Sequence, residues 1–259
     1  MSPKQFEAQL MYTGHMSLRT LINSIADPIL KVLIKRPLIS LFMDSRFQFH
    51  FQILNKSISD SADFAIKNFS DAMYFHKDED LWSYVAKKFS GYPKTESDKM
   101  IIAEFGVWKG RSINFFARRL PNFSVFGFDS FVGFAQDWSG TGIGKGDFSL
   151  FGKLPKVESN VRLFKGWFEE TLPNFVDELS GSQVLILHMD ADIYEPTHFV
   201  LSSLSENIRK GTIVIFDQFF GYFNFNSHEF KAWHEFSSSK GLKYSYIAFT
   251  GKQVAIEIL

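Results

Sequence analysis

The stretch Ile101-Ile-Ala-Glu-Phe-Gly-Val-Trp-Lys-Gly-Arg-Ser-Ile-Asn-Phe-Phe-Ala117 decides the predicted fold. Its apolar start, together with Met100, is typical of a buried strand in a parallel sheet. After Gly110 the apolar residues recur at helical spacing, which predicts a helix. The glycines between the two allow the backbone to come close to a nucleotide-like ligand at the helix N-terminus. The stretch therefore predicts a strand, a glycine turn and a helix arranged around a bound ligand.

The acidic residue Glu104 distinguishes this turn from a dinucleotide-binding turn. The dinucleotide fingerprint has a glycine at that position, and a carboxylate there suits a cationic amine or a hydroxyl better than a pyrophosphate. We therefore interpret the turn as a binding site for S-adenosylmethionine, with Gly106 and Gly110 bringing the backbone close to the cofactor. Ser112 is expected to hold the cofactor's carboxylate near the helix N-terminus. A glycine turn that only packs a helix on a strand would show the same pattern.

The composition narrows the class of protein. The chain has 259 residues, of which 45% are hydrophobic, enough for one large domain with an appended segment. Its 28 basic and 28 acidic side chains cancel, so no overall charge attracts nucleic acid. It has no cysteine, which excludes disulfides and thiolate metal sites. Without a long apolar run or a signal-peptide pattern, we expect a cytoplasmic protein.

Residues 1–98 are expected to form a helical extension that does not enter the sheet. Apolar residues recur at helical spacing over residues 18–33, basic residues follow, and Pro37 should end the helix. Such a helix packs on the domain or on a second subunit of a homo-oligomer, or it rests on a membrane surface as a basic amphipathic helix. Two more helices are predicted over residues 62–75 and 80–89.

From residue 99 to the C-terminus, strands and helices alternate, which is typical of a parallel α/β sheet. A glycine-rich connection over residues 132–156 is long enough to be a lid or binding loop. The last two strands flank Gly251 and are expected to pair as an antiparallel hairpin. Five parallel strands with a terminal antiparallel hairpin match the Rossmann-like sheet of class I methyltransferases. The expected strands cover residues 100–103, 124–128, 161–165, 184–189, 212–216, 243–249 and 253–258.

Carboxylates follow four of the predicted strands, at the edge of the sheet where ligands bind in this fold class. They are Glu104, Asp129, Asp190 and Asp217. Because like charges on one edge repel, we expect a ligand to use them. Asp129 stands about twenty residues after the glycine turn, where an acidic residue accepts hydrogen bonds from ribose hydroxyls. Trp167, after the third strand, either covers the adenine ring or belongs to the core.

Asp190 and Asp192 lie two residues apart, so an extended backbone would place both carboxylates on one face. Two carboxylates that close share a proton or neutralise a metal. Asp217 and Gln218, at the end of the neighbouring strand, would add further oxygen ligands. Hard oxygen ligands predict magnesium or calcium, which would lower the pKa of a bound hydroxyl. Asp192 is the expected base that removes its proton.

At these residues the chain resembles the macrocin and mycinamicin sugar O-methyltransferases over about residues 60–258. That resemblance implies a class I fold, S-adenosylmethionine and magnesium. It also implies that Asp190 and Asp217 bind the metal and that Asp192 is the base. Gln218 departs from the family, which has an acidic third ligand there. The segments that carry the resemblance are Ala103-Glu-Phe-Gly-Val-Trp-Lys-Gly110, Phe126-Gly-Phe-Asp-Ser-Phe131, Lys165-Gly-Trp-Phe168 with Thr171-Leu-Pro173, and Asp190-Ala-Asp-Ile-Tyr-Glu195.

The expected function is therefore S-adenosylmethionine-dependent O-methyl transfer to a hydroxyl, in particular of a sugar or glycosylated metabolite. One alternative is a nicotinamide-dependent oxidoreductase, which Glu104 and the terminal hairpin argue against. The other is a non-catalytic S-adenosylmethionine-binding module, for which Gln218 is the support.

Overall fold

The computed structural model describes residues 45–92, 100–179 and 181–259. The chain forms two compact units, Met1–Asn55 and Lys56–Leu259. Helix α4 (Ser45–Asn68) crosses the boundary, and the sheet lies in the second unit. The basic amphipathic helix expected over residues 18–33 lies outside the described residues. In the part of the chain that the structure describes, no helix is long and apolar enough to cross a membrane.

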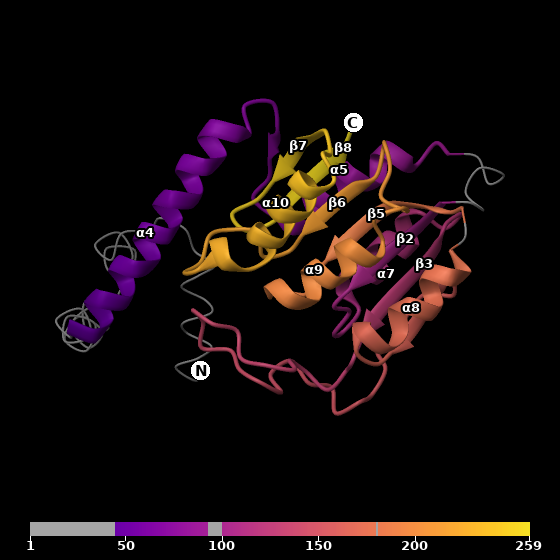
Figure 1. Ribbon diagram of the computed structural model, residues 1–259, viewed down its shortest axis with the longest axis horizontal. Helices are drawn as coiled ribbons and strands as arrows, with labels where there is room; N and C mark the ends of the chain where they lie inside the picture. The colour runs from indigo at the N-terminus through magenta and orange to yellow at the C-terminus, as the bar shows by residue number, and fades with distance from the viewer. Residues whose placement is uncertain (1–44, 93–99, 180) are drawn as a thin grey trace, which may run out of the picture. The chain divides into compact units, whose positions relative to one another are not determined.

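The core of the second unit is one eight-stranded sheet of order β1-β7-β8-β6-β5-β2-β3-β4 (Figure 1). Strand β8 pairs antiparallel with both of its neighbours, β6 and β7, and the other pairings are parallel. This arrangement confirms the predicted five parallel strands with a terminal antiparallel hairpin. The strands are β1 (Met73–Tyr74), β2 (Met100–Phe105), β3 (Ser124–Asp129), β4 (Val161–Lys165), β5 (Gln183–Met189), β6 (Ile213–Phe216), β7 (Tyr244–Phe249) and β8 (Val254–Ile258).

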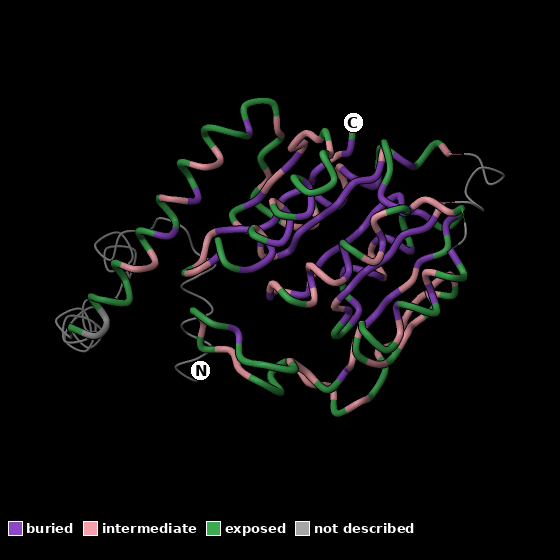
Figure 2. The backbone as a smooth tube through the Cα atoms, in the orientation of Figure 1, coloured by how far each residue is buried: buried purple, intermediate pink, exposed green. Residues whose placement is uncertain are grey.

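Helices cover both faces of this sheet. On one face α5 (Asp78–Phe89) and α7 (Arg111–Arg119) pack against it. On the other lie α8 (Phe168–Glu178), α9 (Tyr194–Ser203) and α10 (Glu229–Ser239), which follows a short 3-10 helix, Phe225–Ser227. Because side chains alternate along a strand, β6 supplies both cores: Ile213 and Ile215 face α5 and α7, and Val214 and Phe216 face α8–α10. The central strands are accordingly buried (Figure 2).

The structure corrects the predicted start of the domain. The helix predicted over residues 62–75 ends at Asn68, and Met73–Tyr74 form β1, which pairs with β7 at the edge of the sheet. A two-residue strand has no periodicity that a sequence pattern can detect. The helix predicted over residues 80–89 begins at Asp78, which gives its first turn three acidic residues that complement the helix dipole. The expectation that nothing before residue 98 enters the sheet is therefore wrong.

Candidate active site

The glycine turn between β2 and α7 brings two strand ends into contact. Gly106 has a φ of +96°, and a Cβ built on it would lie 1.8 Å from the backbone oxygen of Asp190. The Asp190 N–H donates to the Phe105 carbonyl at 2.8 Å, which holds the ends of β2 and β5 together. Gly110, with a φ of +78°, is the N-cap of α7. The two glycines are needed here because other residues rarely adopt these backbone conformations.

The carboxylate of Asp129, at the end of β3, holds this turn in place. Its Oδ2 accepts hydrogen bonds from the backbone N–H of Val107 at 2.9 Å and of Trp108 at 2.7 Å. Its Oδ1 accepts one from Phe131 N–H at 2.6 Å. A carboxylate offers about four acceptor positions, and these three hydrogen bonds use three of them. The structure thus gives Asp129 a role in shaping the turn that the sequence did not reveal.

Glu104 and Ser112 bind each other inside the protein. Ser112 Oγ donates to Glu104 Oε1 at 3.0 Å, and His188 Nδ1 lies 2.9 Å from Glu104 Oε2. Glu104 is 1% exposed and His188 is fully buried. Burial raises the pKa of Glu104, and the hydrogen bond and charge of His188 oppose that rise. His188 was missed by the sequence reasoning, although a histidine within the apolar strand β5 was a visible signal.

Trp167 and Phe168 differ in exposure at the end of β4. Trp167 is the N-cap residue of α8 and is 37% exposed. Its backbone N–H donates to Glu170 at 3.2 Å, which completes a capping interaction. The Phe168 ring packs edge-on against Phe105 at 5.3 Å, so it belongs to the core. Of the two rings, that of Trp167 is the one presented at the surface.

The structure brings Asp190, Asp192 and Asp217 together at the ends of β5 and β6. The Asp217 N–H donates to the Met189 carbonyl at 2.9 Å, which sets the two strand ends side by side. Burial and the neighbouring Asp217 raise the pKa of Asp190 well above its ordinary value. Burial and Asp217 also raise the pKa of Asp192 to about 7, against the opposing charge of Lys252. Asp192 has a φ of +62°, an uncommon conformation of the kind found at functional sites.

Glu229, the first residue of α10, is fully buried and joins the two strand ends. Its Oε1 accepts from the Asp192 N–H at 3.3 Å, and its Oε2 accepts from the Gln218 N–H at 3.0 Å. Burial, and to a smaller extent the charge of Asp192, raises the pKa of Glu229 well above its ordinary value. The sequence reasoning missed this residue, because an acidic residue at a helix start is also what the helix dipole favours.

The residues expected to bind magnesium do not fit a metal. Asp217 already accepts hydrogen bonds from the side-chain nitrogens of Lys252 at 2.8 Å, of Gln218 at 3.2 Å and of Gln253. Because a carboxylate only accepts, Gln218 turns its amide nitrogen, not its oxygen, toward Asp217. Among the described residues, no group of three His, Cys, Asp or Glu side chains is arranged to hold a metal ion.

Three aromatic residues lie beside the acidic cluster. Trp138, in the long loop, packs edge-on against Tyr222 at 5.4 Å, and the Tyr222 ring stacks on His228 at 6.2 Å. Burial and the charges of Glu229 and Asp192 raise the pKa of Tyr222, so this ring lies within electrostatic reach of the acidic cluster. The Trp138 Nε1 and the Tyr222 hydroxyl are both buried between these rings.

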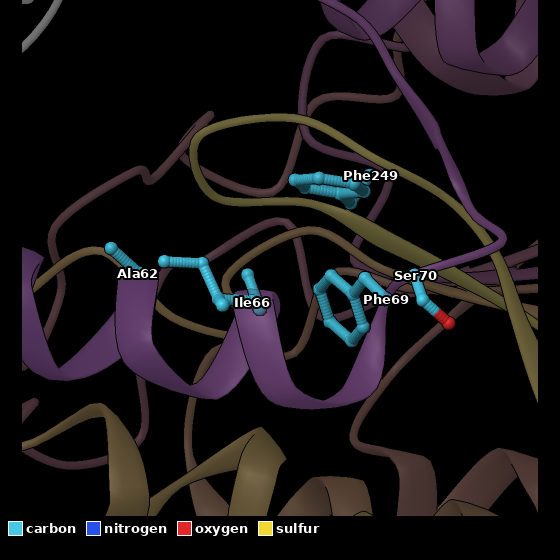
Figure 3. A pocket seen from close by; sticks show the side chains of 6 residues that line it. Ala62, Ile66, Phe69, Ser70 and Phe249 are labelled. Atoms are coloured by element: carbon cyan, nitrogen blue, oxygen red, sulfur yellow. The ribbon is translucent and has the colours of Figure 1, made fainter.

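A separate apolar pocket of about 350 Å³ lies between the end of α4 and β7, and its lining includes none of the predicted site residues (Figure 3). It is lined by Ala62, Ala65, Ile66, Phe69, Ser70 and Phe249.

Comparison with known proteins agrees with this geometry. The crystal structure of CalS11, a calicheamicin methyltransferase, superposes with a TM-score of 0.56 at 19% identity, covering 99% of this chain and 93% of that one. The O-methyltransferase NovP gives a TM-score of 0.50 at 20% identity, covering 69% of this chain and 78% of that one. Likeness at this level of identity shows the fold, which is that of the class I methyltransferases.

A model of the macrocin O-methyltransferase family (TylF) matches residues 144–252, which include the Asp190–Asp192 pair and Asp217. No curated protein sequence matches the chain. The protein is an S-adenosylmethionine-dependent O-methyltransferase, and over the matched residues it resembles the macrocin O-methyltransferases.

Proposed function

We propose that the protein transfers the methyl group of S-adenosylmethionine to a hydroxyl of a sugar or glycosylated metabolite, with Asp192 as the base. The observation that carries the proposal is the contact between Gly106 and Asp190. It sets the cofactor turn directly against the acidic pair, so a methyl donor in the turn lies beside the base. Positioning donor and acceptor in this way can supply much of the rate of a methyl transfer.

On the cofactor side, we propose that the residues around the glycine turn hold S-adenosylmethionine. Asp129 has one acceptor position left for a ribose hydroxyl, and the half-exposed Trp167 would cover the adenine. Glu104 supports the turn from within the protein, because both of its carboxylate oxygens already bond to Ser112 and His188. The proposed cofactor residues are Glu104, Gly106, Gly110, Ser112, Asp129 and Trp167.

On the acceptor side, the aromatic group of Trp138, Tyr222 and His228 supports a sugar. Sugar rings present apolar faces to aromatic side chains, and their hydroxyls bond to polar groups such as an indole N–H or a phenol hydroxyl, which Trp138 and Tyr222 carry. One of the similar structures is that of CalS11 described as a TDP-rhamnose 3'-O-methyltransferase, at a TM-score of 0.50 and 18% identity. A sugar hydroxyl is therefore the acceptor we propose for this chain.

The reaction proceeds in this proposal without a metal-dependent step. In this proposal Asp192 would accept the proton of the acceptor hydroxyl. S-adenosylmethionine, held by the glycine turn, would supply the methyl group to the hydroxyl oxygen, with the electrons of its carbon–sulfur bond passing to sulfur. Glu229 holds the Asp192 backbone so that the carboxylate stays in place. His228 does not serve as base through Nε2, because that atom lies 2.9 Å from the Ser139 carbonyl and must carry a proton to bond it.

The experiment that tests this function has two parts. Calorimetry should show binding of S-adenosylmethionine and its demethylated product, and Asp129→Ala should weaken it, since a charge-assisted hydrogen bond contributes about 1.5–3 kcal/mol. Labelled cofactor should then transfer its methyl group to members of a panel of nucleotide sugars and glycosides. A preference for a nicotinamide cofactor would establish the oxidoreductase alternative instead.

We propose that the methyltransferase domain is the unit Lys56–Leu259, which includes β1 and α5, and that the residues before it form an extension. We propose that the extension contacts a second subunit or a membrane surface, and that the protein acts in the cytoplasm. The basic residues that follow residues 18–33 in the sequence support the contact with a membrane surface.

A further inference from the structure

The side chain of Lys252 reaches the acidic cluster from the turn between β7 and β8. Its Nζ lies 2.8 Å from Asp217 Oδ2 and 3.8 Å from Asp78 Oδ2. The side chain is 29% exposed, while that of Asp217 is 12% exposed, so the ion pair is largely shielded from water. An ammonium group therefore stands where a cation is needed by the carboxylates at the ends of β5 and β6.

The acidic cluster needs such a cation because its carboxylates face one another. Asp190, Asp192 and Asp217 interact with each other, and Glu229 adds a fourth carboxyl from α10. The Lys252 ammonium donates to Asp217 Oδ2 at 2.8 Å and so brings a positive charge into direct contact with this cluster. Lys252 thus performs the charge neutralisation that a divalent cation would otherwise perform.

Two amides occupy two further acceptor positions of Asp217. The Gln218 side chain donates to Oδ2 at 3.2 Å, and the Gln253 side chain donates to Oδ1. Gln253 is itself fixed, because it is fully buried and its Oε1 accepts from Trp82 Nε1 at 3.0 Å. The resemblance implies an acidic metal ligand at position 218. Gln218 instead donates a hydrogen bond to Asp217, and a donor can bind a carboxylate but cannot bind a metal ion.

We propose that Lys252 is a built-in replacement for the divalent metal, so that methyl transfer in this protein requires no metal ion. Lys252 is a positioning residue: it keeps its proton throughout, holds the Asp217 carboxylate in place and offsets part of the negative charge of the cluster. The inference rests on the proposed function for its role in catalysis. The statement that the cluster binds no divalent metal can be tested without any acceptor.

The first experiment is a titration of Mn²⁺ into the full chain, followed by electron paramagnetic resonance with the demethylated cofactor product present. We expect no stoichiometric binding to the wild-type protein. The double variant Lys252→Ala/Gln218→Glu removes the ammonium and adds a carboxylate, and it should bind one Mn²⁺ at least about tenfold more tightly than the wild type does. Lys243→Ala, which removes an exposed lysine just before β7, is the matched control and should gain nothing.

Binding of one Mn²⁺ to the wild-type protein, abolished by Asp217→Asn, would overturn the inference. So would a folded double variant that gains no affinity, with folding judged by its thermal unfolding transition. If the double variant does not fold, the wild-type titration and its Asp217→Asn control still decide the matter.

The second experiment measures methyl transfer. The wild-type rate should be unchanged after exhaustive chelation, and Lys252→Ala should lose activity that added Mg²⁺ partly restores. Lys252→Arg, which keeps the charge, should retain more activity than Lys252→Ala. A wild-type rate that falls on chelation and returns with Mg²⁺ would contradict the inference. If no acceptor is methylated while the Mn²⁺ results are as expected, the proposed function fails and the inference about the cation stands.

Discussion

At the scale of single residues, the proposed reaction depends on Asp192 as the base. This carboxyl is half-buried among other carboxylates, and its pKa is raised to about 7. A base with a pKa near the working pH combines a useful ionised fraction with a strong tendency to take a proton. The sequence predicted the residue from its spacing to Asp190. The sequence did not predict the raised pKa of Asp192, because that shift depends on how far the folded chain buries this carboxyl and on the nearby charge of Asp217.

The pH dependence of the reaction follows from this pKa. A base works only when ionised, so kcat/KM should fall as the pH drops through about 7 and level off above it. The profile is measured with saturating cofactor and a fixed acceptor. A rate that stays constant from about two pH units below 7 to neutral pH would show that Asp192 is not the titrating base.

Glu229 should contribute to stability and activity together. Replacing it with Ala leaves the backbone N–H groups of Asp192 and Gln218 without their acceptor and creates a cavity. We expect the free energy of unfolding to fall by about 2–5 kcal/mol, measured by chemical denaturation. Glu169→Ala, an exposed glutamate in the first turn of α8, is the control and should change it by less than about 0.5 kcal/mol. Equal losses of stability from the two substitutions would show that Glu229 does not hold the two strand ends together.

At the scale of elements, the glycine turn and the strands around it were predictable, because buried parallel strands and glycine turns have strong sequence patterns. The hydrogen bonds that the turn makes were not predictable. Asp129 binds the turn's backbone, and Glu104 binds Ser112 and His188, through pairings across neighbouring strands and across the connection from β2 to α7. Such pairings depend on register, which no local pattern contains. Strand β1 was missed for a different reason, since two residues are too few to show a period.

The turn gives a prediction at this scale. Gly106→Ala places a methyl group against the Asp190 carbonyl in a backbone conformation that alanine rarely adopts. We expect a loss of stability of at least about 1–3 kcal/mol and weaker binding of S-adenosylmethionine, measured by calorimetry. Gly91→Ala is the control, because a Cβ there meets nothing within 4 Å. Unchanged cofactor affinity in a folded Gly106→Ala protein would show that the turn does not bind the cofactor.

At the scale of the whole molecule, the loop over residues 132–156 follows the strand that carries Asp129 and contacts the residues proposed to bind the acceptor. It forms no helix or strand, and it runs as a long trace between β3 and β4 (Figure 1). Ser139 and Trp138 contact His228 and Tyr222, while Phe151 is 90% exposed. Exposed aromatic residues on a loop beside an active site are available to cover a bound acceptor.

We therefore expect the loop to act as a lid. Hydrogen exchange over residues 140–152 should slow when the demethylated cofactor product and an acceptor are both bound, because closure shields the backbone from water. The last turn of α10, Phe236–Ser239, which contains none of the proposed site residues, serves as an internal reference and should exchange equally in both states. Equal exchange of the loop in the free and bound protein would mean that it does not close.

The measurement that tests the central claim most directly is the rate of labelled methyl transfer from S-adenosylmethionine to a nucleotide-sugar acceptor by the wild-type protein and by Asp192→Asn. The Asn side chain keeps the size of Asp192 but takes no proton, so turnover should fall by about 10²–10⁴-fold while cofactor affinity stays the same. Asp177→Asn, on the exposed face of α8, should react at the wild-type rate. A wild-type rate in Asp192→Asn would contradict the account, because the acidic pair would then contain no base.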